Sequence, residues 1–166
     1  MKAIDIGTGY ERGRQLPGAD LCSGNIADDT DPDEGCECFW QFAMSSEPLP
    51  VADGTYDLVW YSYGLYSCDF EDRQSIADEI TRITKPRATL VLRDYTQWYE
   101  GGVHKNIPFK EWMDNLRKIF PGDGFGRGWS IDTVSVLVNS RGEKVEVEDI
   151  DEGALHVTCI LKKGWG

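Results

Sequence analysis

Near its amino terminus the chain reads Lys2-Ala3-Ile4-Asp5-Ile6-Gly7-Thr8-Gly9, a short apolar strand that runs into a carboxylate and a glycine turn. The acidic Asp20 follows soon after. Open α/β sheets hold nucleotide-like cofactors in this way, at the carboxyl end of their first strand. Glycine favours such a turn because it adopts positive φ at little cost and lets the backbone approach a ligand closely. The stretch predicts a cofactor site, and the same glycines also fit a plain structural turn.

The composition fits a single domain over residues 1–166. A chain of 166 residues, 40% of them hydrophobic, is long enough to bury a core. No apolar run approaches the ~20 residues that a membrane helix needs, and the first residues lack the pattern of a signal peptide. We therefore expect a cytoplasmic protein that does not bind membranes.

Charge and cysteine content limit the partners. A formal net charge of −12 argues against bulk nucleic acid, which requires clustered Lys and Arg. The five cysteines are an odd number, as expected of reduced thiols inside a cell. A zinc site on Cys22, Cys36 and Cys38 lacks a convincing fourth ligand, and the acidic loop predicted over residues 22–37 lacks the pattern of a calcium loop. We therefore expect no metal site.

Predicted strands alternate with loops and helices, which is typical of a parallel sheet with right-handed crossovers. We expect strands at residues 2–6, 19–21, 37–42, 56–61 and 88–94. The near-continuous apolar run at 56–61 favours a central strand that is covered on both faces. Between the last two strands, Ile76, Ile80 and Ile83 lie on one face of an amphipathic helix that ends before Pro86.

The last third is less regular. Pro108 begins an apolar stripe that predicts a helix as far as Phe120. Residues 130–142 fit a helix capped by Ser130, whereas the β-branched residues within 133–138 also fit a strand. Residues 144–147 and 155–161 predict two final strands joined by a turn.

Four motifs in this order resemble class I S-adenosylmethionine-dependent methyltransferases. They are residues 5–9, 17–20, 48–59 (Pro48-Leu49-Pro50 through Tyr56-Asp57-Leu58-Val59) and 79–86, which ends in Lys85-Pro86. The resemblance covers residues 2–94 well and the rest by layout. It implies an α/β, Rossmann-like class I methyltransferase fold, mostly parallel, with a C-terminal antiparallel strand, in a compact member with a shortened first crossover.

The resemblance also implies a cofactor, S-adenosylmethionine, and residues that bind it. These residues are Asp5, Gly7, Thr8, Gly9, Asp20, Met44 and Tyr61. Asp20, at the end of the second strand, would accept hydrogen bonds from the ribose hydroxyls, because a carboxylate suits a vicinal diol. Met44 would pack on the adenine as a soft apolar surface.

Two residues are candidates for catalysis. Asp94 ends the fifth predicted strand and would orient substrate, or it caps backbone donors at the strand end. His104 would act as a general base, or it is a solvated loop histidine. Aromatic residues within 95–128 predict a substrate cover, or the core beneath a lid.

The expected function is methyl transfer to a small-molecule or protein acceptor. Glu11 stands where many relatives have a third glycine, and the acid usually found near the adenine has no counterpart. These departures leave as an alternative a catalytically inactive cofactor-binding or protein-interaction module. A dinucleotide-dependent oxidoreductase is a further alternative, against which the short spacing from Gly9 to Asp20 argues.

Overall fold

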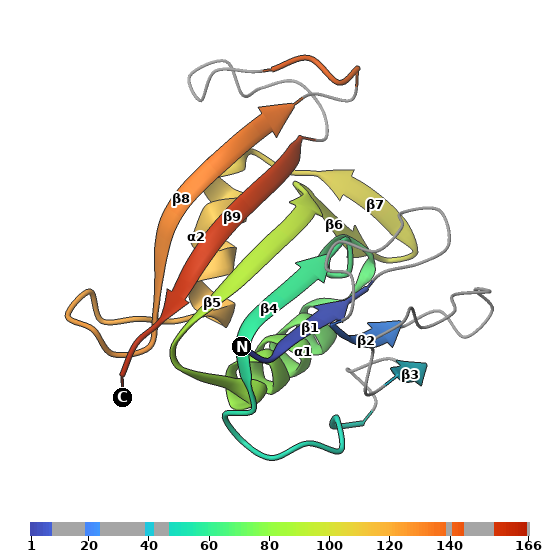
Figure 1. The fold of residues 1–166 in the computed structure, drawn as a ribbon. Coiled ribbons are helices and arrows are strands. Elements are labelled where there is room, and N and C mark those ends of the chain that lie inside the picture. The colour runs from blue at the N-terminus through green and yellow to red at the C-terminus, as the bar shows by residue number, and fades with distance from the viewer. Residues whose placement is uncertain (8–18, 24–38, 42–46, 139–140, 145–154, 166) are drawn as a thin grey trace.

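The structure, a computed structural model, describes residues 1–7, 19–23, 39–41, 47–138, 141–144 and 155–165 (Figure 1). Most of the acidic loop 22–37 therefore lies outside the described residues, as do Cys36 and Cys38. The elements are β1 (Ala3–Ile6), β2 (Asp20–Ser23), β3 (Phe39–Gln41), β4 (Tyr56–Ser62), the 3₁₀ helix η1 (Leu65–Ser67), α1 (Phe70–Ile83), β5 (Thr84–Tyr95), β6 (Gln97–Glu100), β7 (Val103–Asn106), α2 (Phe109–Ile119), β8 (Trp129–Val138) and β9 (His156–Lys163).

Within the described residues, seven strands form one sheet in the order β3-β2-β1-β4-β5-β9-β8. The pairs from β3 to β5 are parallel, and β9 lies antiparallel between β5 and β8. The carboxyl ends of β1, β4 and β5 therefore point to one edge of the sheet, where β9 begins (Figure 1). The predicted α/β fold, with its mostly parallel sheet and C-terminal antiparallel strand, is confirmed.

The two helices lie on the same side of the sheet, behind it in Figure 1. The predicted face of α1, with Ile76, Ile80 and Ile83, is buried in the core. Trp112 and Leu116 are among the buried residues of α2. Burying one apolar face is what fixes each amphipathic helix, because helix propensity alone stabilises so short a segment only marginally. No helix among the described residues is long and apolar enough to span a membrane.

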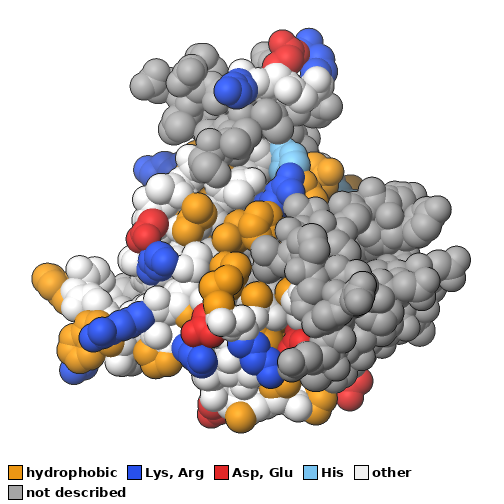
Figure 2. All heavy atoms as spheres, in the orientation of Figure 1, with side chains coloured by type: hydrophobic (Ala, Val, Ile, Leu, Met, Phe, Trp, Pro, Cys, Tyr) orange, Lys and Arg blue, Asp and Glu red, His pale blue; other side chains and the backbone are white. Residues whose placement is uncertain are grey.

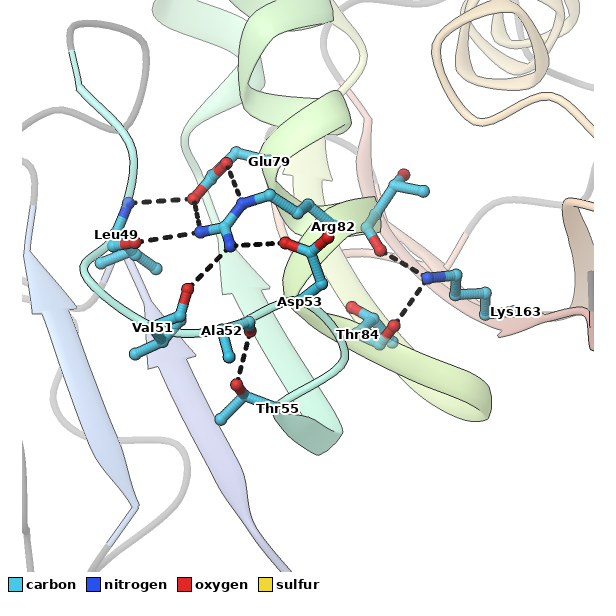
Figure 3. Close-up of polar contacts among 10 residues, drawn as sticks. Leu49, Val51, Ala52, Asp53, Thr55, Glu79, Arg82, Thr84 and Lys163 are labelled. Carbon is cyan, nitrogen blue, oxygen red and sulfur yellow. Dashed lines mark hydrogen bonds and ion pairs between the residues drawn. The ribbon is translucent and has the colours of Figure 1, made fainter.

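Arg82 of α1 holds the segment before β4 against the helix (Figure 3). Its guanidinium donates to the carbonyls of Leu49 and Val51, at 2.9 and 2.7 Å, and pairs with Asp53 at 3.0 Å. Glu79 accepts from Arg82 Nε at 2.9 Å and from the Leu49 N–H at 2.9 Å. The leucine-proline motif of the sequence thus has a structural explanation, because this network fixes the entry to β4.

Lys163, the last residue of β9, ties the carboxyl-terminal strand to the end of α1. Its ammonium donates to the carbonyls of Thr81 and Thr84, at 2.6 Å each (Figure 3). A cation at a helix carboxyl end also complements the helix dipole. This contact fixes the position of the end of β9 relative to α1.

The helix predicted over residues 130–142 is wrong. Residues 129–138 form β8, which pairs along β9 with register shifts after Ile131 and Val134. The strand alternative prevails because β9 offers a free ladder edge, and β-branched residues have weak helix propensity. The strand predicted at 144–147 lies mostly outside the described residues.

The hairpin of β6 and β7 was not predicted. Gly101 and Gly102 join its strands with φ of 59° and 81°, and two consecutive positive φ values are typical of a type I′ turn. The hairpin falls within residues 95–128, where a substrate cover is predicted. The hairpin lies beside η1, and its role as a substrate cover stays a prediction.

Candidate functional site

Gly7 and Ser62 meet at the carboxyl edge of the sheet, where β1 and β4 end. Gly7 has a φ of 84°, and its N–H donates to the Cys22 carbonyl at 2.9 Å. A Cβ at position 7 would overlap the carbonyl oxygen of Ser62. Glycine is therefore required for two reasons, the left-handed backbone and the close approach of β4. This junction brings the ends of β1, β2 and β4 together.

Ser62 is fully buried, and its hydroxyl has no hydrogen-bond partner in the described part of the chain. Leaving a buried hydroxyl unsatisfied costs about 1–3 kcal/mol. Such groups persist where a ligand or water supplies the missing partner. The Gly7–Ser62 junction therefore has the features that a polar cofactor bound at this edge requires: a glycine turn and an unused polar group.

Three other predicted cofactor residues lie in the described part of the chain, namely Asp5, Tyr61 and Asp20. Asp5 is fully buried in β1 and pairs in register with Leu21 and Trp60. Tyr61 is buried in β4, with its phenol directly against Gly64, where a Cβ would overlap it. Thr8, Gly9 and Met44 lie outside the described residues, so their cofactor roles stay predictions.

Asp20 does not end the second strand, as the sequence analysis expected, but begins it. It pairs in register with Ile4, and its buried carboxylate accepts a 2.8 Å hydrogen bond from the Tyr56 hydroxyl. Tyr56 is itself the first residue of β4. Asp20 therefore begins β2 instead of ending it, and its contact with the ribose stays a prediction.

Asp94 makes the backbone contacts expected of the structural alternative, and its role toward a substrate stays a prediction. The residue is fully buried near the end of β5. Its Oδ2 accepts from the Leu65 N–H at 2.9 Å and its Oδ1 from the Tyr95 N–H at 2.8 Å. With both oxygens bonded to backbone donors, Asp94 fixes η1 on the sheet edge.

Six aromatic side chains gather at the same edge, and we call them the aromatic cluster. They are Tyr63, Tyr66, Tyr95, Tyr99, His104 and His156. Neighbouring ring centroids lie 5.0 to 5.5 Å apart, within the range of favourable aromatic pairs. In Figure 2 a histidine lies beside hydrophobic and basic side chains at the upper end of the sheet.

Tyr63 and His156 form the polar centre of the cluster. The Tyr63 hydroxyl and His156 Nε2 are hydrogen-bonded. Burial, with a smaller effect of the nearby Arg93, lowers the pKa of His156 below its usual 6.5. The lowered pKa favours the neutral ring at pH 7, in which Nε2 can accept the tyrosine proton.

The backbone of Tyr63 has a φ of 55°, which is rare for a residue with a bulky side chain. The Tyr63 N–H donates to the Arg93 carbonyl at 2.7 Å, and the Arg93 guanidinium carbon lies 5.8 Å from the centroid of the tyrosine ring. Such backbone strain is concentrated at functional sites. Tyr63 directly follows the last residue of β4, and its ring contacts Tyr95 and His156.

His156 was missed by the sequence analysis, and His104 was chosen instead. His104 is exposed on β7 and stacks on Tyr66 at 5.3 Å. His156 lies 93 residues from Tyr63 along the chain, and the β5–β9 register brings it opposite Tyr95. The strand predicted at 155–161 already contains His156, but the sequence does not show that this strand pairs with β5.

No group of three or more His, Cys, Asp or Glu side chains that could hold a metal ion occurs among the described residues.

The sheet order and the site edge are those of the class I methyltransferase fold, and comparisons with known proteins agree. The profile of a family described as "Methyltransferase domain" matches residues 5–92, more than half of the chain. The chain belongs to this family, and the predicted membership of the class I S-adenosylmethionine-dependent methyltransferases is confirmed. No curated protein matches the sequence.

Solved structures share the fold at low identity. A SAM-dependent methyltransferase from Methanosarcina mazei is 16% identical, with a TM-score of 0.60, over 99% of this chain and 93% of that one. A methyltransferase from Mesorhizobium loti is 11% identical, with a TM-score of 0.58, over 98% and 90%. Geranyl diphosphate C-methyltransferase from Streptomyces coelicolor, in complex with Mg2+, geranyl-S-thiolodiphosphate and S-adenosyl-L-homocysteine, is 11% identical, with a TM-score of 0.59, over 98% of this chain and 69% of that one. The family match and these neighbours support the predicted enzyme class and cofactor.

Proposed function

We propose that the chain binds S-adenosylmethionine at the Gly7–Ser62 junction and transfers its methyl group to a small-molecule or protein acceptor lying on the aromatic cluster. The observation that carries the proposal is the buried, unpartnered hydroxyl of Ser62 beside the glycine turn. The junction lies at the carboxyl ends of parallel strands, where open α/β sheets bind their ligands.

The aromatic cluster supports an acceptor site next to that junction. Tyr63 directly follows Ser62 in the chain. An acceptor on the aromatic cluster would therefore lie next to the Gly7–Ser62 junction. Partly exposed rings can enclose an apolar or cationic group. The neighbour from Streptomyces coelicolor was solved with a small molecule, geranyl-S-thiolodiphosphate, which suits the small-molecule option here.

Tyr63 and His156 would accept the proton of a hydroxyl or amine acceptor. Bound S-adenosylmethionine would supply an electrophilic methyl group, whose bond to the sulfonium sulfur breaks as a lone pair of the acceptor forms the new bond. The acceptor proton passes to the Tyr63 oxygen while the Tyr63 proton moves to His156 Nε2, so the pair ends with a protonated imidazole. Holding the acceptor in line contributes most of the rate, and proton transfer contributes less.

Calorimetric titration with S-adenosylmethionine and with its demethylated product tests the binding. The Ser62→Ala variant makes the test specific, because it removes the unsatisfied hydroxyl. We expect at least tenfold weaker binding, about 1.4 kcal/mol, with stability equal to or above that of the wild type. Ser75→Ala is the matched control. It removes an exposed hydroxyl of α1 that donates to the Glu71 carbonyl. Folded wild-type protein that binds neither ligand would overturn the proposal.

A pH–rate profile tests the proton transfer once an acceptor has been found by screening. Because neutral His156 is the active form, kcat should fall as the pH drops through its lowered pKa. The groups that face His156 are Tyr63, Tyr95 and Arg93. His156→Gln should lower kcat and remove the acidic limb, whereas His104→Gln should change KM and keep the limb. An acidic limb that persists in His156→Gln argues against this role.

The position of Asp20 favours a second candidate, a binding module that retains the fold without turnover. Asp20 begins β2, whereas the motif predicts a ribose-binding acid at the end of this strand. Micromolar binding of the cofactor without methyl transfer to any acceptor from a lysate would support this candidate. Methyl transfer to a defined acceptor would exclude it.

A further inference from the structure

The loop between α2 and β8 exposes an aromatic side chain beside another at the end of the described chain. Phe125 in the loop is 87% exposed and Trp165 is 61% exposed, and they are the two most exposed hydrophobic aromatic side chains in the described part of the chain. Exposed apolar side chains that gather at one place mark interaction sites, whereas single ones are ordinary. We call the surface made by residues 121–128, Arg87, Gly164 and Trp165 the Phe125 corner.

Backbone hydrogen bonds fix the loop against the residues that follow β9. The Trp165 N–H donates to the Gly126 carbonyl at 3.1 Å, and the Gly164 N–H donates to the Gly128 carbonyl at 2.5 Å. A Cβ on Gly126 would lie 2.5 Å from Trp165 Nε1, so the indole lies directly on the loop backbone. Phe125 directly precedes Gly126, and both aromatic side chains therefore flank the same glycine.

Asp123 stabilises the loop from within. Its Oδ1 accepts from the N–H groups of Phe125 at 2.7 Å and of Arg127 at 3.1 Å, and these bonds hold the pKa of the carboxyl below its usual 3.8. The Asp123 N–H also donates to the Arg127 carbonyl at 3.1 Å. Because the loop is fixed before a partner arrives, binding there would cost little ordering entropy.

Two exposed arginines belong to the same corner. Arg127 is part of the loop, and the Arg87 N–H donates to the Gly164 carbonyl at 3.3 Å. Neither guanidinium forms a hydrogen bond or an ion pair with a residue that the structure describes. Figure 2 shows basic and hydrophobic side chains together at the lower left, where Figure 1 places the loop and the carboxyl terminus. In a chain of net charge −12 this corner is locally positive.

The charges of the corner favour one kind of partner. Each guanidinium can bind a carboxylate through two parallel N–H donors, and the aromatic pair can cover an apolar side chain. A second copy docked about a two-fold axis would bring the same arginines against each other. A nucleic acid or an anionic membrane spreads its charge over a much larger surface and would be repelled by the net charge of −12.

We propose that the Phe125 corner binds an acidic peptide segment of a partner protein, in which carboxylates flank an apolar residue. The carboxylates would pair with Arg87 and Arg127, and the apolar residue would cover Phe125 and Trp165. Aromatic residues and arginine are the side chains that contribute most to protein–protein interfaces.

The corner is separate from the proposed methyl-transfer site and does not depend on that function. β9 begins opposite Tyr95, at the edge that carries the Gly7–Ser62 junction, and ends at Lys163, next to the corner. The corner therefore lies at the other end of the strands (Figure 1). A partner bound there would leave the aromatic cluster open to an acceptor.

Titration of the full chain with the blocked peptide Glu-Glu-Leu-Phe-Glu-Glu, at pH 7 and low salt, tests the proposal. NMR follows the indole N–H of Trp165 and the amide of Gly126, and we expect saturable shifts of both. A peptide with glutamine in place of glutamate, and one with alanine in place of leucine and phenylalanine, should each bind at least fivefold more weakly. No saturable binding of the acidic peptide, or equal affinity of the glutamine peptide, would overturn the proposal.

Variants locate the site. Phe125→Ser should weaken peptide binding at least tenfold and Arg127→Gln several-fold, with unfolding midpoints like that of the wild type because both side chains are exposed. Val103→Ser removes an exposed apolar side chain of β7, and Arg117→Gln removes an exposed arginine of α2; both controls should bind as the wild type does. Unchanged affinity in folded Phe125→Ser would contradict the assignment.

The other occupants give different results. Sedimentation equilibrium should give the same mass for the wild type and Phe125→Ser, and a dimer that Phe125→Ser dissociates would overturn the proposal in favour of a second copy. Phosphatidylserine vesicles and a single-stranded oligonucleotide should bind more weakly than the acidic peptide. Tighter binding of either one that is lost in Phe125→Ser would overturn the proposal as well.

Discussion

The hydroxyl of Tyr56 donates a 2.8 Å hydrogen bond to Oδ2 of Asp20, and this bond joins the first residues of β4 and β2 on either side of β1. Both side chains are buried, at 0% and 4% exposure. A buried carboxylate needs such a donor, because its desolvation is otherwise uncompensated. This hydrogen bond links β4 to β2 and suggests a structural role for Asp20, the acid that its motif position assigns to the ribose.

Replacing either partner of this bond should cost stability and spare the cofactor. Tyr56→Phe leaves the Asp20 carboxylate buried without this donor, and we expect a loss of about 1–3 kcal/mol in the free energy of unfolding. Asp20→Ala should be destabilised as well, while its affinity for S-adenosylmethionine stays within threefold of wild type. Denaturant unfolding and calorimetry measure the two quantities. A tenfold loss of affinity for S-adenosylmethionine at unchanged stability would instead support a contact between Asp20 and the ribose.

Alanine substitutions at Gly7 and Gly101 distinguish the cost of backbone strain from the cost of steric overlap. Gly7 and Gly101 both have positive φ, at 84° and 59°, but only a Cβ on Gly7 would meet another atom, the Ser62 carbonyl oxygen. Gly101→Ala should cost about 1–2 kcal/mol, the penalty for left-handed backbone. Gly7→Ala should lose more stability and also the binding of S-adenosylmethionine. Equal losses in the two variants would show that β1 and β4 can separate at little cost.

Asp94 should act as a positioning residue. Asp94→Asn can retain only one of its two backbone acceptor bonds, to Leu65 or to Tyr95, and we expect about 1–3 kcal/mol of destabilisation. Since η1 carries Tyr66, the variant should also change the near-ultraviolet circular dichroism of the aromatic cluster. Asp69→Asn is the matched control, because the Asp69 side chain makes no capping hydrogen bond on α1. Full stability of Asp94→Asn would contradict the structural role.

The sequence predicted those parts of the fold whose signals are local. The apolar run at 56–61 and the isoleucine face of α1 specify a covered strand and a helix without reference to distant residues. The helix predicted over residues 130–142 is wrong because the local preference there is weak, and hydrogen bonding to β9 makes the segment a strand. The Gly101-Gly102 pair was a readable hairpin signal that the sequence analysis did not use.

The site was less predictable than the fold. Gly7 could be placed from its motif, but the register that sets Asp20 beside Ile4 cannot be read from spacing. The pairing of Tyr63 with His156 joins positions 93 residues apart, and no local pattern encodes it. His104 was chosen because it lies near a predicted site loop, whereas His156 reaches the site only because β9 pairs with β5.

The pair of Glu79 and Arg82 should make stability depend on pH in the acid range. Arg82, then the N–H of Leu49, lowers the pKa of Glu79 below its usual 4.5, so the folded state binds this proton more weakly than the unfolded state. The resulting stabilisation is complete above pH 4.5 and is lost as the pH falls through the lowered pKa. Glu79→Gln should flatten this part of the profile and lower stability at pH 7.

Asp114→Asn, which breaks the exposed pair with Arg117, should change the profile little, because exposed ion pairs contribute about 0–1 kcal/mol. Unfolding curves from pH 7 down to pH 3 measure both variants, and an unaltered slope in Glu79→Gln would contradict the role of the pair.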